Sequence, residues 1–420
     1  MKSPFLKSLK TWRQILQAHK PLGWAQLSHQ KTRLLVAVTG VAFSNILIFT
    51  QLGIRALLFD GVTLLPDNLK GDLFLVSAYA PTIDWGTFPI IHLYKANAVE
   101  GVASASPLYI STANWVNPED LLPSNPSDEG SESGDGPPQI TLFPNRVKVL
   151  ALNPVAPVLD IPEVNQQLDQ LNAPDVLLFD RLAQEKLGPV SGLFAETGEV
   201  ITVMNNRRVR VVGLFSLGSN MFDNGHVVMS DWNYARRRGR DSLSRVNIAS
   251  LTLDPGADLL TVQARLQAHL SKDVRVLTRE EVAESEQNFQ ASLPNGKVLS
   301  FGAAMGFIVG IVIVYQVLYT DVSDHLPEYA TLKAMGYSDR ALLIVVLQEA
   351  LILAVIGFIP GFITSYWVYG LLTQVTRIPL TMRADVAFQI FILTLVMCIV
   401  SGGIAMNKLR SADPADCFRG

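Results

Sequence analysis

The sequence is poor in charged residues and in cysteine. Only 17% of its 420 residues are Asp, Glu, Lys or Arg, whereas soluble domains carry about 25%. The two cysteines, Cys398 and Cys417, cannot build a disulfide framework. A net charge of −3 excludes the strongly basic balance that is typical of nucleic-acid-binding proteins. The composition therefore indicates a membrane protein whose fold depends on apolar packing.

The sequence also lacks the motifs of common catalytic sites. Gly296-Lys297 is not followed by Ser or Thr and has no glycine five residues earlier, so it is not a phosphate-binding loop. His92 and His226 are isolated, without the spacing of metal ligands, and we expect His226 to be an ordinary hairpin residue. Ser191 lacks the Gly-x-Ser-x-Gly setting of a hydrolase nucleophile. We expect no catalytic residue, cofactor or metal in this chain.

Long apolar runs, in contrast, are abundant. A hydrocarbon core about 30 Å thick requires roughly 20 apolar residues in a helix. Four runs meet this length, at residues 34–54, 298–319, 342–372 and 386–406. The third exceeds one crossing and contains Pro360, which predicts a kink or an extension beyond the bilayer. We expect four transmembrane α-helices, the first being an anchor that is not cleaved, because no small-residue cleavage site follows it.

The distribution of Lys and Arg predicts the orientation of these helices. Residues 1–33 carry seven basic residues and no acid, and form the predicted cytoplasmic N-terminal segment. With the loop at 320–341 and the tail at 407–420 also inside, twelve basic residues lie on the cytoplasmic side. The short outer loop holds only Arg377 and Arg383. We therefore expect both termini in the cytoplasm and residues 55–297 outside it.

Residues 55–297 carry 20 basic and 29 acidic side chains and no cysteine, which suits a soluble domain outside the cytoplasm. Strand–helix–strand patterns occur near both of its ends. They lie at 71–79, 88–102 and 103–111, and again at 249–255, 256–270 and 274–278. These patterns predict an α+β domain, inserted between the first two spans, whose two halves meet around an insertion. A helix from Arg279 to about Leu293 then leads into the second span.

The insertion contains three segments with distinct predictions. Residues 205–218 and 223–231 are expected to be hairpin strands, because Asn224-Gly225 is a strong turn signal. The Pro-, Gly-, Ser- and acid-rich segment 123–138 predicts a disordered loop, with a cation-binding loop as the alternative. The arginine cluster at 236–240 is interpreted as a solvated loop, or as a contact for an acidic partner or lipid headgroups.

Two features of the spans call for packing or polar partners. Gly302, Gly306 and Gly310 form a small-xxx-small face, which allows close helix packing within the chain or in a dimer. Glu349 lies inside the third span, where an acid should face protein or water. For Glu349 the alternatives are a structural partner near the interface and a proton relay.

A compact polar segment, EYATLKAMGYSDRA, separates the second and third spans at Glu328–Ala341. Pro327 suits a first helical turn and Gly336 suits a helix end, which predicts a short capped helix at the cytoplasmic surface. Leu332 and Met335 lie on one face with Glu328, at positions i+4 and i+7. A capped helix can transmit force to the spans, which a flexible loop cannot.

This segment resembles the cytoplasmic helix of FtsX/MacB-type ABC permeases, which have a Glu-x-Ala-Thr-Leu-Lys-Ala-x-Gly run between spans two and three. The layout of one span, a large outer domain and three further spans is also similar. Residues 30–60, 302–337, 348–362 and 409–418 resemble most closely the DevC-type permeases of cyanobacteria. The resemblance covers nearly the whole chain except the insertion at 123–138.

The resemblance implies a permease subunit of a tripartite ABC exporter in the inner (plasma) membrane. Such permeases form homodimers, recruit a cytoplasmic ABC ATPase that holds the ATP and Mg, and work with a periplasmic membrane-fusion protein and a TolC-like outer-membrane channel. Known members export heterocyst glycolipids, and related systems act by mechanotransmission. By position, the resemblance assigns the ATPase-docking coupling helix to Glu328, Thr331, Leu332, Lys333, Met335 and Gly336.

Three other functions are alternatives to export for this chain. A membrane regulator that activates a cell-wall hydrolase, as FtsX does, would have a hydrolase as its outer partner. A lipoprotein-release permease would bind an acylated protein at the outer domain. An ectoenzyme is disfavoured because no nucleophile or metal-binding pattern is present.

Overall fold

The structure is a computed structural model that describes residues 31–121, 145–324, 339–376, 380 and 382–410. The predicted loop at 123–138 lies outside these residues. The chain divides into two compact units. One, the sheet unit, extends from Ala56 to Gly296, and the other, the helical unit, holds most of the remaining chain.

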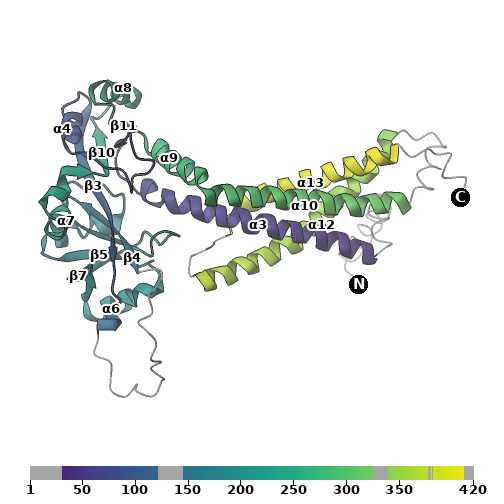
Figure 1. The fold of residues 1–420 in the computed structure, drawn as a ribbon, viewed down its shortest axis with the longest axis horizontal. Helices are drawn as coiled ribbons and strands as arrows, with labels where there is room; N and C mark the ends of the chain where they lie inside the picture. Colours follow the sequence, from purple (N-terminus) through teal and green to yellow (C-terminus); the bar gives the residue numbers. More distant parts are fainter. Residues whose placement is uncertain (1–30, 122–144, 325–338, 377–379, 381, 411–420) are drawn as a thin grey trace, which may run out of the picture. The chain divides into compact units, whose positions relative to one another are not determined.

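Four helices are long and apolar enough to cross a membrane, as predicted, and they make up the helical unit except for the end of the first helix, which from Ala56 belongs to the sheet unit. They are α3 (Lys31–Asp67), α10 (Pro294–Asp324), α12 (Asp339–Thr376) and α13 (Ala384–Arg410). Figure 1 shows them running alongside one another. Buried residues from all four helices, such as Val41, Val314, Leu353 and Met397, form one apolar core. Pro360 lies inside α12 without ending it, and α12 is long enough to extend beyond a single crossing.

The sheet unit is built on a nine-stranded mixed sheet with the order β11-β1-β10-β3-β4-β8-β5-β7-β6. Its strands are β1 (Leu73–Ser77), β3 (Val102–Asn114), β4 (Arg146–Leu152), β5 (Val176–Asp180), β6 (Val200–Met204), β7 (Arg207–Phe215), β8 (His226–Ser230), β10 (Ile248–Leu253) and β11 (Val274–Leu277). A second, two-stranded sheet pairs β2 (Phe88–Pro89) with β9 (Arg245–Val246).

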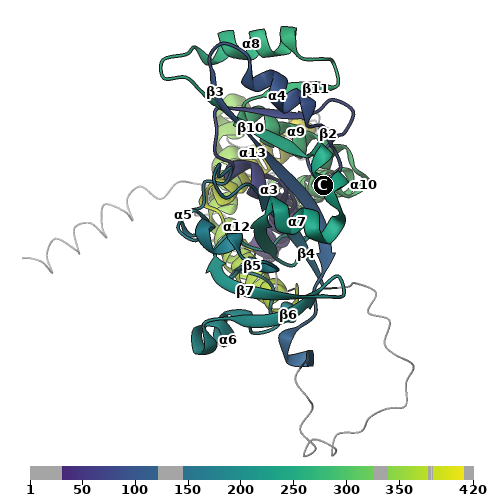
Figure 2. The same cartoon turned by 90° about the vertical axis from the view of Figure 1, so that its left-hand side faces the viewer.

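Helices cover both faces of the large sheet. They are α4 (Ile91–Asn97), α5 (Pro162–Asn165), α6 (Val190–Thr197), α7 (Asp231–Arg238), α8 (Leu259–His269) and α9 (Arg279–Ser292), with 3₁₀ turns η1 (Pro118–Leu121), η3 (Leu168–Asn172), η4 (Glu185–Leu187) and η5 (Arg240–Ser244). Figure 2 shows α4 and α8 near the β11 end of the sheet and α6 near the β6 end. Successive residues of β1 belong to different cores: Leu73 and Leu75 to one, Phe74 and Val76 to the other. Each face of the sheet therefore has its own apolar core.

The two predicted strand–helix–strand units are confirmed as β1-α4-β3 and β10-α8-β11. They interleave, because β1 pairs antiparallel with both β10 and β11, and β10 pairs antiparallel with β3. The predicted helix after β11 is also confirmed, as α9. Strands and helices of these short lengths were predictable because their apolar periodicity is local.

Residues 205–218 and 223–231 contain strands, β7 and β8, as predicted, but their pairing as a hairpin is wrong. β7 instead forms a hairpin with β6, through a turn at Asn205 and Asn206 in which both residues have positive φ. β8 lies between β4 and β5, parallel to the first and antiparallel to the second. All five residues of β8 are buried, which is typical of a central strand and outweighs the local turn signal of Asn224-Gly225.

Candidate functional site

The predicted docking residues Glu328, Thr331, Leu332, Lys333, Met335 and Gly336 lie outside the described residues. Their role as the ATPase-docking helix stays a prediction. The structure describes what flanks them, since α10 ends at Asp324 and α12 begins at Asp339. In sequence, the predicted docking residues therefore lie between two helices of the membrane bundle, a few residues from each.

The predicted glycine face of α10 lies against α3 of the same chain. A Cβ added to Gly302 would be 2.8 Å from the Gln51 side chain, and one added to Gly306 would be 3.3 Å from Ile48. A Cβ on Gly310 would collide with Met397 of α13 and approach Ser44 of α3. These glycines allow the backbones of α3 and α10 to approach closely.

A second glycine row, which the sequence reasoning missed, packs on α3 from α12. A Cβ on Gly357 would lie 2.6 Å from Val41, and one on Gly361 would lie 2.8 Å from Asn45. These two glycines are four residues apart, so the same small-xxx-small signal could have identified them. α3 is therefore packed against glycine faces of two different helices, which indicates a tight central helix.

Polar side chains add specific links inside the bundle. The Thr394 hydroxyl of α13 lies 2.7 Å from Oδ1 of Asn45 and 2.8 Å from the Ile390 carbonyl of its own helix. The Ser401 hydroxyl of α13 is shared in the same way between the Ile311 carbonyl of α10 and its own Met397 carbonyl, and Tyr369 of α12 donates to the Phe49 carbonyl of α3. Hydrogen bonds of this kind in lipid contribute about 0.6 kcal/mol each, up to about 2. They fix the register of the four helices.

Glu349 is fully buried on α12 and interacts with Asp321, which is buried on α10. Both acids face protein rather than lipid, as expected for carboxyl groups within spans. The sequence singled out Glu349 but not Asp321, because only the packing of α10 against α12 brings them together. The structure thus places an acid beside Glu349, at the end of the bundle where α10 approaches the predicted docking segment.

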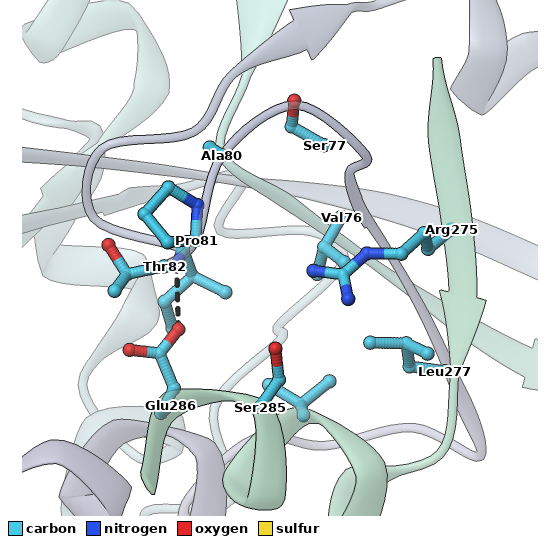
Figure 3. A pocket seen from close by; sticks show the side chains of 11 residues that line it. Val76, Ser77, Ala80, Pro81, Thr82, Arg275, Leu277, Ser285 and Glu286 are labelled. Carbon is cyan, nitrogen blue, oxygen red and sulfur yellow. Dashed lines mark hydrogen bonds between the residues drawn. The ribbon is translucent and has the colours of Figure 1, made fainter. Parts of the chain in front are cut away.

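The connection from the sheet unit to the second span is a well-anchored helix, α9. Thr278 and Glu281 form a capping box at its start, an arrangement that satisfies two otherwise free backbone N–H groups. Farther along, the Ile83 N–H donates a 2.7 Å hydrogen bond to Oε1 of Glu286. Figure 3 shows Glu286 and Arg275 facing a small pocket between α9, β1 and β11. After α9 only Leu293 precedes α10, so α9 links the sheet unit to the span.

Glu286 is an unusual acid because it is 6% exposed. Burial raises its pKa to about 7, and the nearby Asp84 charge raises it as well. The hydrogen bond from Ile83 and the charges of Lys148 and Arg275 act in the opposite direction. The carboxyl therefore titrates near neutral pH in a position that holds α9 against the sheet unit.

The histidines have structural settings. His226 is not a hairpin residue, because it begins the buried strand β8 with Nδ1 3.4 Å from Asp180 Oδ2. Asp180 also accepts hydrogen bonds from the backbone of Leu182, Leu217 and Gly218. His92 is buried beside Phe88. Within the part of the chain that the structure describes, no three His, Cys, Asp or Glu side chains form a group that could hold a metal ion.

The arginine cluster is largely exposed, as predicted, but most of it forms the last turn of α7 rather than a loop. Arg236 and Arg237 lie 3.5 and 3.6 Å from Asp175 carboxylate oxygens, and the Arg237 side chain is almost buried. Arg238 lies over the Tyr234 ring at 5.7 Å. The helix could have been expected, because cations at a helix C-terminus are favoured by its dipole.

Two protein-family descriptions match the chain. The MacB-like periplasmic core domain matches residues 34–269, and the FtsX-like permease C-terminal region matches residues 300–414. An uncharacterized ABC transporter permease of Bacillus subtilis (strain 168), YvrN, is 27% identical over 170 residues. That match covers 39% of this chain and only 39% of the relative.

Two solved structures are similar at 12% sequence identity each. The periplasmic region of MacB from Actinobacillus actinomycetemcomitans gives a TM-score of 0.31 and covers 55% of this chain and 98% of that one. The extracellular domain of the noncanonic ABC-type transporter YknZ from Gram-positive bacteria gives a TM-score of 0.28, with 50% and 100% covered.

The first family description covers more than half of the chain and ends in the sheet unit, while the second covers the three following spans. This order matches the observed architecture of one span, a large α/β domain and three further spans. The chain belongs to the family with a MacB-like periplasmic core domain, and it carries the C-terminal region of an FtsX-like permease.

Proposed function

We propose that this chain is the permease subunit of a tripartite ABC exporter. The observation that carries the proposal is the order of the two family regions, a MacB-like periplasmic core followed by an FtsX-like permease region, in one four-span chain. The sequence has no phosphate-binding loop. ATP and Mg therefore belong to a separate cytoplasmic ATPase, and this chain is not itself an enzyme.

The role we propose is mechanical. The predicted docking residues from Glu328 to Gly336 bind the ATPase, and movement of α10 reaches the sheet unit through α9. Two features support this route: α9 is separated from α10 by a single residue, and it is held by a capping box and a buried carboxylate. The spans are closely packed through glycine faces and contain few ionisable residues. Such a bundle is better suited to transmitting movement than to forming a polar pore.

The assembly we propose contains two copies of this chain, an ABC ATPase, a periplasmic membrane-fusion protein and a TolC-like channel. Both termini lie in the cytoplasm, because this orientation places twelve basic residues on the inner side of the membrane and only two in the short outer loop. The resemblance to DevC-type permeases suggests a glycolipid or another amphiphilic cargo. In this scheme the cargo reaches the outer domain without crossing the inner membrane through this chain.

The test is affinity isolation of the tagged full-length chain from native membranes, followed by mass spectrometry. Recovery of an ABC ATPase together with a membrane-fusion protein is the expected result. An ATPase with a cell-wall hydrolase and no fusion protein would replace the exporter with an FtsX-like regulator. An ATPase with an acylated protein at the outer domain would indicate lipoprotein release.

A further inference from the structure

The sheet unit contains an open cleft of about 670 Å³. Its walls come from the segment between β1 and β2, from β3 and β4, from α7 and η5, and from the end of α9. All of its lining residues lie between Ala56 and Gly296. Its volume falls in the range of small-molecule sites, which is about 300–1,000 Å³. The two families and the mechanical role assign no ligand to this cleft.

The floor of the cleft is polar, and Lys148 and Asp223 are buried there while Asp84 is more exposed. Lys148 Nζ lies 2.8 Å from Asp84 Oδ2 and 3.0 Å from Asp223 Oδ2. Burial alone lowers the pKa of Lys148, but these two carboxylates outweigh it and raise that pKa. Gln290 also lines the cleft and is only 3% exposed, yet its Nε2 has no hydrogen-bond partner in the described structure.

One wall carries an aromatic residue that is both exposed and held in place. Trp85 is 73% exposed, with its ring edge-on to Phe289 at 5.7 Å. The loop around it is fixed by Asn247 Nδ2, which donates to the Ile83 carbonyl at 3.1 Å and to the Gly86 carbonyl at 3.2 Å. A large ring held in position at the mouth of a cleft is suited to binding an apolar group without further ordering cost.

The apolar wall continues beyond Trp85. Phe222, which is 45% exposed, together with Leu293 and Val62, lines the same cleft. An exposed apolar patch beside a polar cavity is typical of a ligand-binding site. The wall can cover an alkyl or acyl chain, while the polar floor requires a different chemistry at the other end of the ligand.

The rim supplies that chemistry as positive charge. Arg146, Arg238 and Arg245 line the cleft. Of its four acids, Asp84 and Asp223 pair with Lys148, which leaves Asp241 and Glu286. None of these three arginines forms an ion pair within the described part of the chain. Arg245 is oriented by hydrogen bonds of 2.8 Å to the Thr87 hydroxyl and carbonyl. Arginine recognises phosphate and carboxylate groups through its planar set of donors.

We propose that this cleft binds an anionic amphiphile. The phosphate or carboxylate head lies at the arginine rim, and the chain lies on Trp85, Phe222 and Phe289. Neither end alone accounts for the cleft, because the exposed aromatic wall and the arginine rim line the same space. The proposal concerns binding by the sheet unit and does not depend on coupling to an ATPase.

The test uses the full chain in nanodiscs of zwitterionic phosphatidylcholine, titrated calorimetrically with hexyl phosphate against empty nanodiscs. Inorganic phosphate and hexyl β-glucoside serve as probes for the head and the chain alone. We expect saturable binding of hexyl phosphate, at least about tenfold tighter than either probe, since each removes a contact of about 1.4 kcal/mol or more. Equal affinity for the glucoside would refute recognition of charge, and equal affinity for inorganic phosphate would refute recognition of the chain.

Variants separate the two ends of the site. Arg146→Gln and Trp85→Ala should each weaken hexyl phosphate binding about tenfold, and neither should impair folding, since both side chains are exposed. Arg208→Gln removes an equally exposed arginine of β7 that does not line the cleft, and should leave affinity within about twofold. Absence of saturable binding, or equal effects of Arg146→Gln and Arg208→Gln, would overturn the proposal.

Discussion

Replacing Glu286 by Gln should make the sheet unit more stable at alkaline pH. The carboxyl is buried, and its pKa is raised from an ordinary 4.5 to about 7, chiefly by that burial. The difference of roughly 2.5 pH units, at about 1.36 kcal/mol each, corresponds to about 3 kcal/mol. Glutamine keeps an oxygen that can accept the Ile83 hydrogen bond, but it has no charge to bury.

The sign of the pH dependence follows from proton binding. Below pH 4.5 the carboxyl is protonated in both the folded and the unfolded chain, so Glu286 and its amide replacement should give similar stability. Between about pH 4.5 and 7 the folded state keeps a proton that the unfolded state has released, so the Glu286 contribution to stability falls as pH rises. Above about pH 7 the full cost of the buried carboxylate is present.

The assay is thermal unfolding of the full chain in detergent, followed by tryptophan fluorescence from pH 4.5 to 8.5. At pH 8.5, E286Q should unfold about 6–12 °C above the parent chain, given about 2–4 °C per kcal/mol for units of this size. The two curves should converge towards pH 4.5. Glu284→Gln is the matched control, because Glu284 is an exposed acid on the same helix and should leave the pH profile unchanged. An E286Q profile parallel to that of the parent chain would refute the reasoning.

Three further predictions follow from the packing, the buried ion cluster and the resemblance. Gly310→Val should disrupt the contact of α10 with its neighbours and lower the unfolding temperature of the helical unit, whereas Gly310→Ala should have a smaller effect. Lys148→Met leaves the buried Asp223 without its cation and removes the partner of the more exposed Asp84, and should cost about 3 kcal/mol of folding stability, measurable by urea unfolding. Glu328→Lys should lower ATPase turnover in the reconstituted complex while membrane insertion is unchanged. Normal ATPase turnover in this variant would show that Glu328 is not part of the docking face.

Much of the architecture could be predicted because its signals are local. Four apolar runs of membrane-spanning length predicted the four helices, and alternating periodicities predicted β1-α4-β3, β10-α8-β11 and α9. The small-xxx-small pattern singled out the glycines of α10, although it left open whether they meet the same chain or a second copy. Sequence spacing defines such a face but not the surface that covers it.

The tertiary structure decided which segments meet. β8 became a central strand because β4 and β5 pair with both of its edges and the two apolar cores cover both of its faces, so a locally strong turn signal did not produce a hairpin. Likewise, only the packing of α12 on α3 shows why Gly357 and Gly361 are needed. Only the packing of α10 against α12 brings Asp321 beside Glu349.

The cleft shows most clearly the difference between what local sequence signals predict and what the tertiary structure decides. Trp85, Lys148, Arg238 and Gln290 are far apart in the sequence, and each alone has an ordinary local context. Composition and periodicity determined that this chain has four spans and a large folded domain outside them. Only long-range strand pairing and helix packing brought an aromatic wall, a buried ion cluster and an arginine rim around one cavity, because such contacts depend on the whole fold rather than on neighbouring residues.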